Sequence, residues 1–212
     1  MPPQSTRFWL IRHALVDAEA RKTLYGTDDV PICESTMAAQ GPAYAELGRR
    51  LPQPARWLVT PLSRTHRTAQ AIFAAGYPAQ RWTVAPAFIE QSFGRLQGLD
   101  GAALPAHLTL PAHDFWPISH AERPQDGESF EDVLLRVGAE MESLAATCPG
   151  EDIVIVCHGG AIRAAIAHVL GLGGAAALRL SIGNISLTRL EQRGQAWRVI
   201  SANETVEGVP VL

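Results

Sequence analysis

Residues 153–160 read Ile-Val-Ile-Val-Cys-His-Gly-Gly, an apolar run that ends in a histidine and two glycines. Such a continuous run of mostly β-branched residues is typical of a strand that is covered on both faces, as in the centre of a parallel sheet. A helical pattern follows at once, because Ile162, Ile166 and Val169–Leu170 share one face of residues 160–170. The stretch therefore predicts a strand, a glycine turn and a helix, which is the repeating unit of an α/β protein.

The same alternation continues outward from this unit in both directions. Short β-branched and aromatic runs predict strands at residues 8–12, 57–60, 81–84, 153–157, 182–190 and 197–202. Helical spacing predicts helices at about 42–51, 64–75, 127–146 and 160–170. Ser129 and Asp132 form a variant of the capping box near the start of the longest helix. The predicted fold class is α/β, a three-layer α/β/α sandwich with a mostly parallel central sheet.

The chain length favours one domain over residues 1–212. One segment, at about 99–126, breaks the alternation and contains four prolines and three histidines. Long excursions of this kind in compact domains are usually functional loops or disordered segments. We expect this excursion to lie over the sheet and to form part of a cap that faces a substrate.

Composition excludes several classes of partner. The net charge is only −3, so no basic field indicates nucleic acid or an anionic membrane surface. No apolar stretch approaches the roughly 18 residues of a membrane span, and no signal peptide is recognisable. Three cysteines, Cys33, Cys148 and Cys157, form no CxxC pair, as expected of a reducing compartment. We therefore expect a soluble, cytoplasmic protein, and the apolar run 182–190 could mediate a homodimer, although membership of the sheet explains it more simply.

Chemically useful side chains follow three of the predicted strands. Arg12 and His13 follow the first, Ser63 and Arg64 come soon after the second, and His158 with two glycines follows the run 153–157. Ligands of open α/β sheets gather outside the carboxyl ends of the strands. The free N–H groups at Gly159 and at the other helix start also favour an anion. Each of these short motifs is common by itself, but the three together predict a phosphate-binding pocket.

Five ordered blocks in the chain resemble the histidine phosphatase superfamily, also called the phosphoglycerate mutase-like family. The blocks span most of the sequence. They are Leu10-Ile11-Arg12-His13; Thr60-Pro61-Leu62-Ser63-Arg64-Thr65 with Thr68-Ala69; Glu90 with Phe93-Gly94 and Gly98; Gly127-Glu128-Ser129-Phe130; and Val156-Cys157-His158-Gly159-Gly160 with Ile162-Arg163.

The resemblance implies a role for each matching residue. His13 matches the nucleophile that forms a phosphohistidine. Glu90 matches the acid that protonates the leaving oxygen and then activates water. The groups that hold the phosphoryl oxygens are matched by Arg12, Arg64 and His158, with Gly159 beside them. Weaker matches to the pocket rim are Thr27, in a loop beside the nucleophile, and Asn184, in the strand expected at 182–190.

The resemblance implies no metal and no cofactor. His107, His113 and His120 lie in the excursion, where a metal site is conceivable, but no carboxylate or cysteine at ligand spacing accompanies them. We expect ordinary solvated loop histidines. Because Glu90 must carry a proton when the ester breaks, we also expect best activity at mildly acidic to neutral pH.

The implied function is hydrolysis of a small phosphorylated metabolite by a metal-independent phosphatase, and two alternatives stay open. A phosphoglycerate mutase of this family carries a longer, basic insertion, whereas residues 90–127 contain only Arg95 and Arg123 as cationic side chains. The other alternative is a phosphoprotein phosphatase or a phosphoprotein-binding module. Pure binding would need neither His13 nor Glu90.

Overall fold

The structure, a computed structural model, describes residues 5–206. Its single six-stranded sheet has the order β3-β2-β4-β1-β5-β6. The strands are β1 (Ser5–Arg12), β2 (Arg56–Val59), β3 (Trp82–Val84), β4 (Asp152–Cys157), β5 (Leu187–Arg193) and β6 (Ala196–Glu204). The pairings β1–β4, β2–β4 and β2–β3 are parallel, whereas β1–β5 and β5–β6 are antiparallel. The parallel half brings the carboxyl ends of four strands to one edge.

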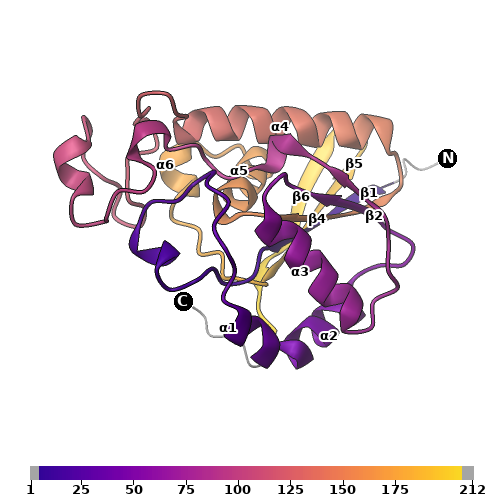
Figure 1. Ribbon diagram of the computed structural model, residues 1–212. Helices are drawn as coiled ribbons and strands as arrows, with labels where there is room; N and C mark the ends of the chain where they lie inside the picture. The colour runs from indigo at the N-terminus through magenta and orange to yellow at the C-terminus, as the bar shows by residue number, and fades with distance from the viewer. Residues whose placement is uncertain (1–4, 207–212) are drawn as a thin grey trace.

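Helices cover both faces of this sheet, as Figure 1 shows with α4 on one side and α1 to α3 on the other. The α-helices are α1 (Glu34–Ala39), α2 (Gly41–Arg50), α3 (Ser63–Ala74), α4 (Phe130–Thr147), α5 (Gly159–Leu170) and α6 (Gly174–Ala177). Short 3-10 turns occur at Ala20–Lys22, Pro86–Phe88, Gly94–Leu96 and Leu104–His107. The three-layer α/β/α prediction is confirmed. The sequence does not predict α1 and α6, which are too short for helical periodicity to be visible.

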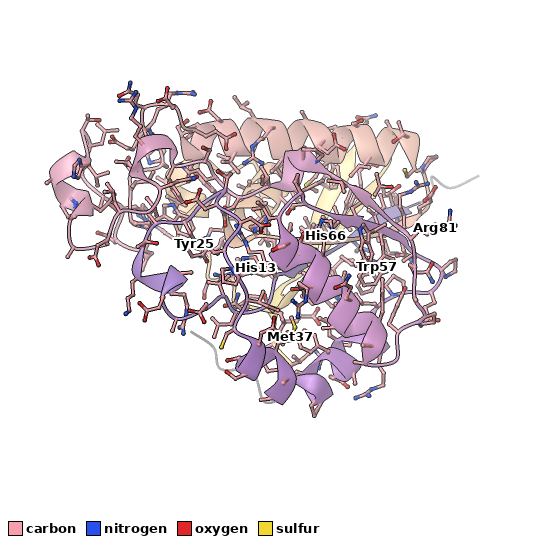
Figure 2. All side chains as sticks on the ribbon, in the orientation of Figure 1. His13, Tyr25, Met37, Trp57, His66 and Arg81 are labelled. Carbon is pink, nitrogen blue, oxygen red and sulfur yellow. The ribbon has the colours of Figure 1, made fainter. Side chains whose placement is uncertain are left out.

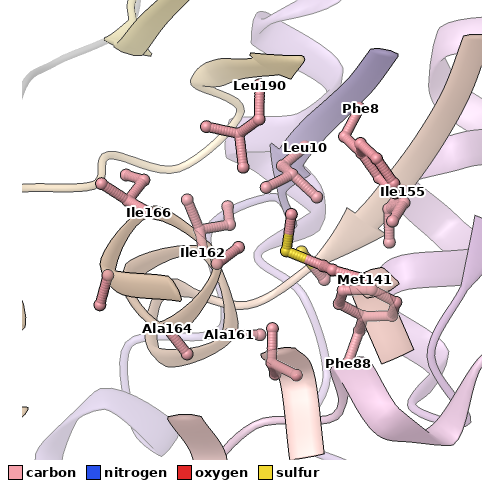
Figure 3. Packing of buried hydrophobic residues seen from close by; sticks show 14 of the residues in the cluster. Phe8, Leu10, Phe88, Met141, Ile155, Ala161, Ile162, Ala164, Ile166 and Leu190 are labelled. Atoms are coloured by element: carbon pink, nitrogen blue, oxygen red, sulfur yellow. The ribbon is translucent and has the colours of Figure 1, made fainter. Parts of the chain in front are cut away.

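The central strands are buried on both faces because their alternate side chains enter two different cores. Ile153 and Ile155 of β4 belong to the core under α4 and α5, which Figure 3 shows around Phe8, Leu10 and Met141. Val154 and Val156 belong to the core under α2 and α3. This is why β4 reads as a continuous apolar run.

The expectation of a strand over 182–190 is wrong in its first half. β5 begins only at Leu187, and Ile185 adopts a left-handed backbone with φ of 49°. The segment turns there, and the N–H of Ile185 donates to the carbonyl of Arg12 at the end of β1. Ile182 and Ile185 are apolar because they are buried in the two cores, and neither is free to mediate a dimer.

The excursion at 99–126 is a folded cap with its own small core, and it projects beside α6 in Figure 1. Ile118 is fully buried and clusters with Phe93, Leu96 and Leu104. The Glu122 carboxylate accepts hydrogen bonds from both backbone and side-chain groups of residues 109–110. The capping box of Ser129 and Asp132 then begins α4. Among residues 5–206, no helix combines the length and apolar character that crossing a bilayer requires.

Candidate active site

The strand register brings two histidines together. Arg12 at the end of β1 pairs with Cys157 at the end of β4, so His13 and His158 follow at the same level of the edge. The N–H of His13 donates to the carbonyl of Cys157 over 2.9 Å. The two imidazole rings lie 5.1 Å apart between centroids. Both side chains are buried, 1% and 0% exposed.

His13 has a defined tautomer in this position. Its Nδ1 lies 2.7 Å from the carbonyl oxygen of Ala14, which can only accept, so Nδ1 carries the proton. Nε2 is therefore the unprotonated nitrogen. Burial lowers the pKa of His13 well below its usual value, and the Arg64 and Arg12 cations lower it further. The ring is thus held neutral with a lone pair on Nε2.

His158 has the opposite tautomer. The Nε–H of Arg64 points at Nδ1 over 3.4 Å, and Nε2 lies 2.8 Å from Oγ1 of Thr60. The proton therefore sits on Nε2 and is donated to Thr60. Burial, His13 and the nearby arginines lower the pKa of His158 well below its usual value. To donate to a phosphoryl oxygen through Nδ1, this ring must take up a second proton.

Two arginines flank the histidine pair. Arg64, at the start of α3, is fully buried, and its terminal nitrogens donate to the carbonyls of Gly26 and Asp28 over 2.7 Å each. The Arg64 guanidinium also lies over the Tyr25 ring, at 5.3 Å. Arg12 donates through Nη1 to the carbonyl of Ile182, while its buried Nε has no hydrogen-bond partner among residues 5–206. Buried donors of this kind call for an acceptor, and an anion provides one.

Glu90 reaches the same edge from the segment that follows β3. Its carboxylate, 8% exposed, accepts hydrogen bonds from the backbone N–H of Gln91 and from that of Gly160 in the first turn of α5. A Cβ on residue 160 would lie 2.1 Å from Oε1 of Glu90. Glycine at this position is therefore what lets the carboxylate approach the helix.

A cavity of about 200 Å³ opens beside these groups. Its lining comes from β1, the loop after the first 3-10 turn, the Glu90 segment, the excursion and α5. The lining residues are Arg12, Thr23, Leu24, Tyr25, Gly26, Glu90, Phe93, Trp116, Pro117, Gly159 and Arg163. His13 directly follows Arg12, which is one of these lining residues, and Figure 2 labels both His13 and Tyr25. His13 and His158 are not among these lining residues, and both side chains are buried.

The weaker site candidates lie in different surroundings. Gly159 lines the cavity, but Thr27 does not, and its hydroxyl instead donates to Oε1 of Gln97 over 2.7 Å. Asn184 lies in the turn before β5, where its Nδ2 donates to the backbone carbonyl of His13 over 2.8 Å. Asn184 therefore supports the backbone of His13.

Sequence reasoning missed the position of Arg163 and left Trp116 without a specific role. Arg163 is quoted above only as part of a block, although its place five residues after His158, one turn into α5, puts it on the cavity side of the helix. Trp116 comes from the excursion, and the guanidinium of Arg163 lies over its ring at 4.6 Å.

The three excursion histidines do not form a metal site in the described part of the chain. No group of three or more His, Cys, Asp or Glu side chains there is arranged to hold a metal ion. His113 is engaged through Nε2 with the carbonyl of Ala175 and through Nδ1 with the N–H of Phe115. His120 lies 3.8 Å from Glu131.

A model of the histidine phosphatase superfamily (branch 1) matches residues 8–205. The chain belongs to this superfamily. The match includes both histidines, both flanking arginines and Glu90, and the resemblance stated from the sequence blocks is thereby confirmed.

Several curated proteins are similar to this chain at modest identity. A bifunctional protein of Mycobacterium tuberculosis (strain H37Rv) is 28% identical over 186 residues, which are 88% of this chain and 50% of that protein. This chain thus spans about half the length of the first relatives that it matches. A probable phosphoglycerate mutase GpmB of Serratia proteamaculans is 29% identical over 198 residues, covering 89% of this chain and 86% of the relative.

Solved structures agree on the fold. A mycobacterial glucosyl-3-phosphoglycerate phosphatase superposes with a TM-score of 0.77 at 25% identity, over 95% of this chain and all of the other. A structure of that phosphatase with bound VO3 gives a TM-score of 0.75 at 27% identity, over 94% and 99% of the two chains.

Proposed function

We propose that this protein hydrolyses phosphomonoesters of small metabolites through a phosphohistidine on His13, without a metal. The observation that carries the proposal is the state of His13. Its Nδ1 proton is committed to the Ala14 carbonyl, and Nε2 is left unprotonated between two arginine cations. An imidazole nitrogen must have a free lone pair to attack phosphorus, and the adjacent cations match the charge of the phosphoryl oxygens.

The reaction has two steps. In the first, Nε2 of His13 forms a bond to phosphorus, the ester P–O bond breaks, and protonated Glu90 gives its proton to the leaving oxygen. In the second, water attacks the phosphohistidine, the Glu90 carboxylate accepts a proton from that water, and the P–N bond breaks to release phosphate. Arg12 and Arg64 hold the phosphoryl oxygens in both steps.

Two features support a small substrate and water as the acceptor. The cavity of about 200 Å³ is below the usual range of pockets for drug-sized ligands, which favours a small phosphorylated group. The cationic side chains between Glu90 and Gly127 are paired outside the cavity, Arg95 with Asp126 and Arg123 with Asp132. They are therefore not placed to retain a bisphosphorylated intermediate, as a mutase requires.

The glucosyl-3-phosphoglycerate phosphatase among the similar structures supports hydrolysis, whereas the probable phosphoglycerate mutases are similar proteins that match the alternative. The free state of Cys33, Cys148 and Cys157 supports the further proposal of a reducing, cytoplasmic location.

The test is hydrolysis of 4-nitrophenyl phosphate in the presence of EDTA by the wild type and by His13→Ala, with His107→Ala as a matched control in the exposed excursion. We expect activity that survives chelation, is unchanged in the control, and falls by a factor of at least about 10³ in His13→Ala, because the covalent route is lost. Rapid quenching of the wild type should also trap an acid-labile phosphoryl-enzyme.

Activity retained by His13→Ala would refute the nucleophile. Loss of wild-type activity in EDTA, restored by a divalent ion, would refute metal independence. Efficient phosphoryl transfer between the 2 and 3 positions of phosphoglycerate, without release of phosphate, would replace hydrolysis by the mutase alternative.

A further inference from the structure

Glu90 lies on a piece of chain without regular secondary structure. Residues 89–93 run between two 3-10 turns, and neither a helix nor a strand includes them. The repeating hydrogen bonds of a helix or a strand therefore do not fix this backbone, and its N–H and C=O groups find other partners. Because a general acid must lie within hydrogen-bond reach of the oxygen that it protonates, these partners decide where the carboxylate points.

Arg136, in the second turn of α4, holds the segment by two backbone carbonyls. Its Nη1 donates to the carbonyl of Ala87 over 2.7 Å, and its Nη2 donates to the carbonyl of Glu90 itself over 3.2 Å. The two acceptors lie three residues apart. One rigid, planar guanidinium therefore spans the chain that leads into Glu90.

Glu128, in the turn before α4, holds the chain on the other side of Glu90. Its carboxylate forms a bidentate ion pair with Arg136, to Nε over 2.8 Å and to Nη2 over 3.0 Å. The same carboxylate accepts from the N–H of Ser92 over 3.1 Å. The backbone of Glu128 donates to the carbonyl of Ser92 and accepts from Nε2 of Gln91, each over 2.8 Å. We call this pair of side chains the Glu128–Arg136 clamp.

Glycine at position 127 is what brings the clamp against the segment. A Cβ on residue 127 would lie 2.7 Å from the carbonyl oxygen of Ser92 and 2.7 Å from the backbone nitrogen of Gly94. Contacts this short do not occur with a real side chain, so the two stretches of backbone can touch only with glycine there. The Glu128 carboxylate thereby reaches the N–H of Ser92.

We propose that the Glu128–Arg136 clamp is a positioning device for the acid: it fixes the backbone at Glu90 and so aims the carboxylate at the leaving oxygen. The inference rests on the proposed function, in which Glu90 protonates that oxygen. Arg136 and Glu128 are not among the residues that line the cavity, so they act through Glu90 and not on the substrate. Loss of the clamp therefore slows most those esters whose leaving group needs a proton.

The test is a double-mutant cycle between Arg136 and Glu90. Values of kcat/KM are measured on phenyl phosphate and on 4-nitrophenyl phosphate, which are similar in shape, although phenol needs protonation more than 4-nitrophenol does. The variants are Arg136→Met, Glu90→Gln and the two together. Arg95→Met is the matched control, because Arg95 pairs with Asp126 at an exposed place in a neighbouring part of the chain.

We expect Arg136→Met to lower kcat/KM for phenyl phosphate by about tenfold or more, since a small misplacement of a catalytic group can cost about 10² in rate. The loss on 4-nitrophenyl phosphate should be less than about threefold, because little proton transfer is needed there. In the Glu90→Gln background Arg136→Met should cause no further loss, since the acid that it positions is gone. Arg95→Met should retain wild-type rates.

Arg136→Lys separates the shape of the side chain from its charge. The Arg136 cation is among the groups that lower the pKa of His158, and lysine retains this charge but has no planar fork for a carboxylate and two carbonyls. Arg136→Lys should therefore lose rate on phenyl phosphate much as Arg136→Met does. A full rate in Arg136→Lys would overturn the inference, as would equal losses of Arg136→Met on both esters or an additive loss in the double variant.

Amide hydrogen exchange of peptides that cover residues 87–94 reads the clamp without turnover. Protection should fall in Arg136→Met and in the milder variant Glu128→Gln, and it should remain in Arg95→Met. Unchanged protection in both clamp variants would overturn the clamp. Hydrolysis of neither ester by the wild type would instead refute the proposed function. Thermal melts of each variant exclude a global folding defect as the cause.

Discussion

At the residue scale, the site separates two chemically identical side chains by their hydrogen bonds. The Ala14 carbonyl takes the Nδ1 proton of His13, and Thr60 takes the Nε2 proton of His158. One ring therefore has its lone pair on Nε2, as the proposed nucleophile requires, and the other presents Nδ1 toward Arg64. Burial and neighbouring arginines keep both rings neutral by lowering their pKa values.

The lowered pKa of His13 predicts the acidic side of the pH–rate profile. A free imidazole loses its nucleophilic form as pH falls through about 6.5. His13 should stay neutral below that value, so kcat/KM for an alkyl phosphate should not fall between about pH 7 and 6. On the alkaline side it should decline, because Glu90 must be protonated in the first step. Steady-state rates across pH 4–10 measure both sides. A rate that falls on acidification with an apparent pKa near 6.5 would contradict the neutral state of His13. A rate that still rises above pH 9 would contradict Glu90 as the acid.

At the element scale, the amino end of α5 contacts the Glu90 carboxylate and also forms part of the cavity wall. Gly160 donates its N–H to Glu90, and the absence of a Cβ at residue 160 allows that approach. The same turn carries Gly159, and the next turn carries Arg163. One helix start thereby positions the proposed general acid and part of the cavity wall.

Gly160→Ala tests the link between α5 and Glu90. The new Cβ would lie 2.1 Å from Oε1 and must displace the carboxylate. We expect kcat/KM for an alkyl phosphate to fall by about 10²-fold or more, the usual contribution of a positioned general acid. The loss should be smaller for 4-nitrophenyl phosphate, whose leaving group needs less protonation.

Gly173→Ala is the matched control, because a Cβ there meets nothing within 4 Å. It should retain wild-type rates on both substrates. Equal losses of Gly160→Ala on both substrates would show that the substitution acts on the phosphate pocket and not on the acid.

At the scale of the whole molecule, the sheet places its buried cations and neutral histidines at one edge between two apolar cores. This arrangement has a cost at low pH. In the folded protein His13 and His158 resist protonation, whereas in the unfolded chain they take up protons below about pH 6.5. The unfolded state then binds more protons, so the free energy of unfolding falls as pH falls.

We therefore expect urea unfolding to show lower stability at pH 5.5 than at pH 7.5, with a slope of up to about 1.4 kcal/mol per pH unit for each histidine below its unfolded pKa. Carboxylates with lowered pKa, such as Glu151, lose their stabilising effect only below their unfolded value and so act at lower pH. His158→Gln should flatten the dependence, and His107→Gln, in the exposed excursion, should not. An unchanged slope in His158→Gln would refute this origin.

The sequence by itself determined the layers of this protein and the set of residues at its active edge. Residues 153–157 are all apolar, so both faces of the strand carry apolar side chains. This pattern is typical of a strand that is covered on both faces, and it predicted the sandwich. His13 and His158 directly follow β1 and β4, and Arg64 lies at the start of α3, which follows β2. Their meeting at one edge follows from parallel pairing alone, because parallel strands end on the same side.

Only the tertiary structure decided which tautomer each histidine adopts, where β5 begins, and what surrounds Arg163. Ile182 and Ile185 look like strand residues because burial in a turn and burial in a strand select the same apolar side chains. The partners of Arg163 come from Leu180 and from Trp116 in the excursion, with no local pattern linking them. Hydrogen bonds and cation–π contacts between distant segments depend on the packed geometry, and residue spacing does not encode it.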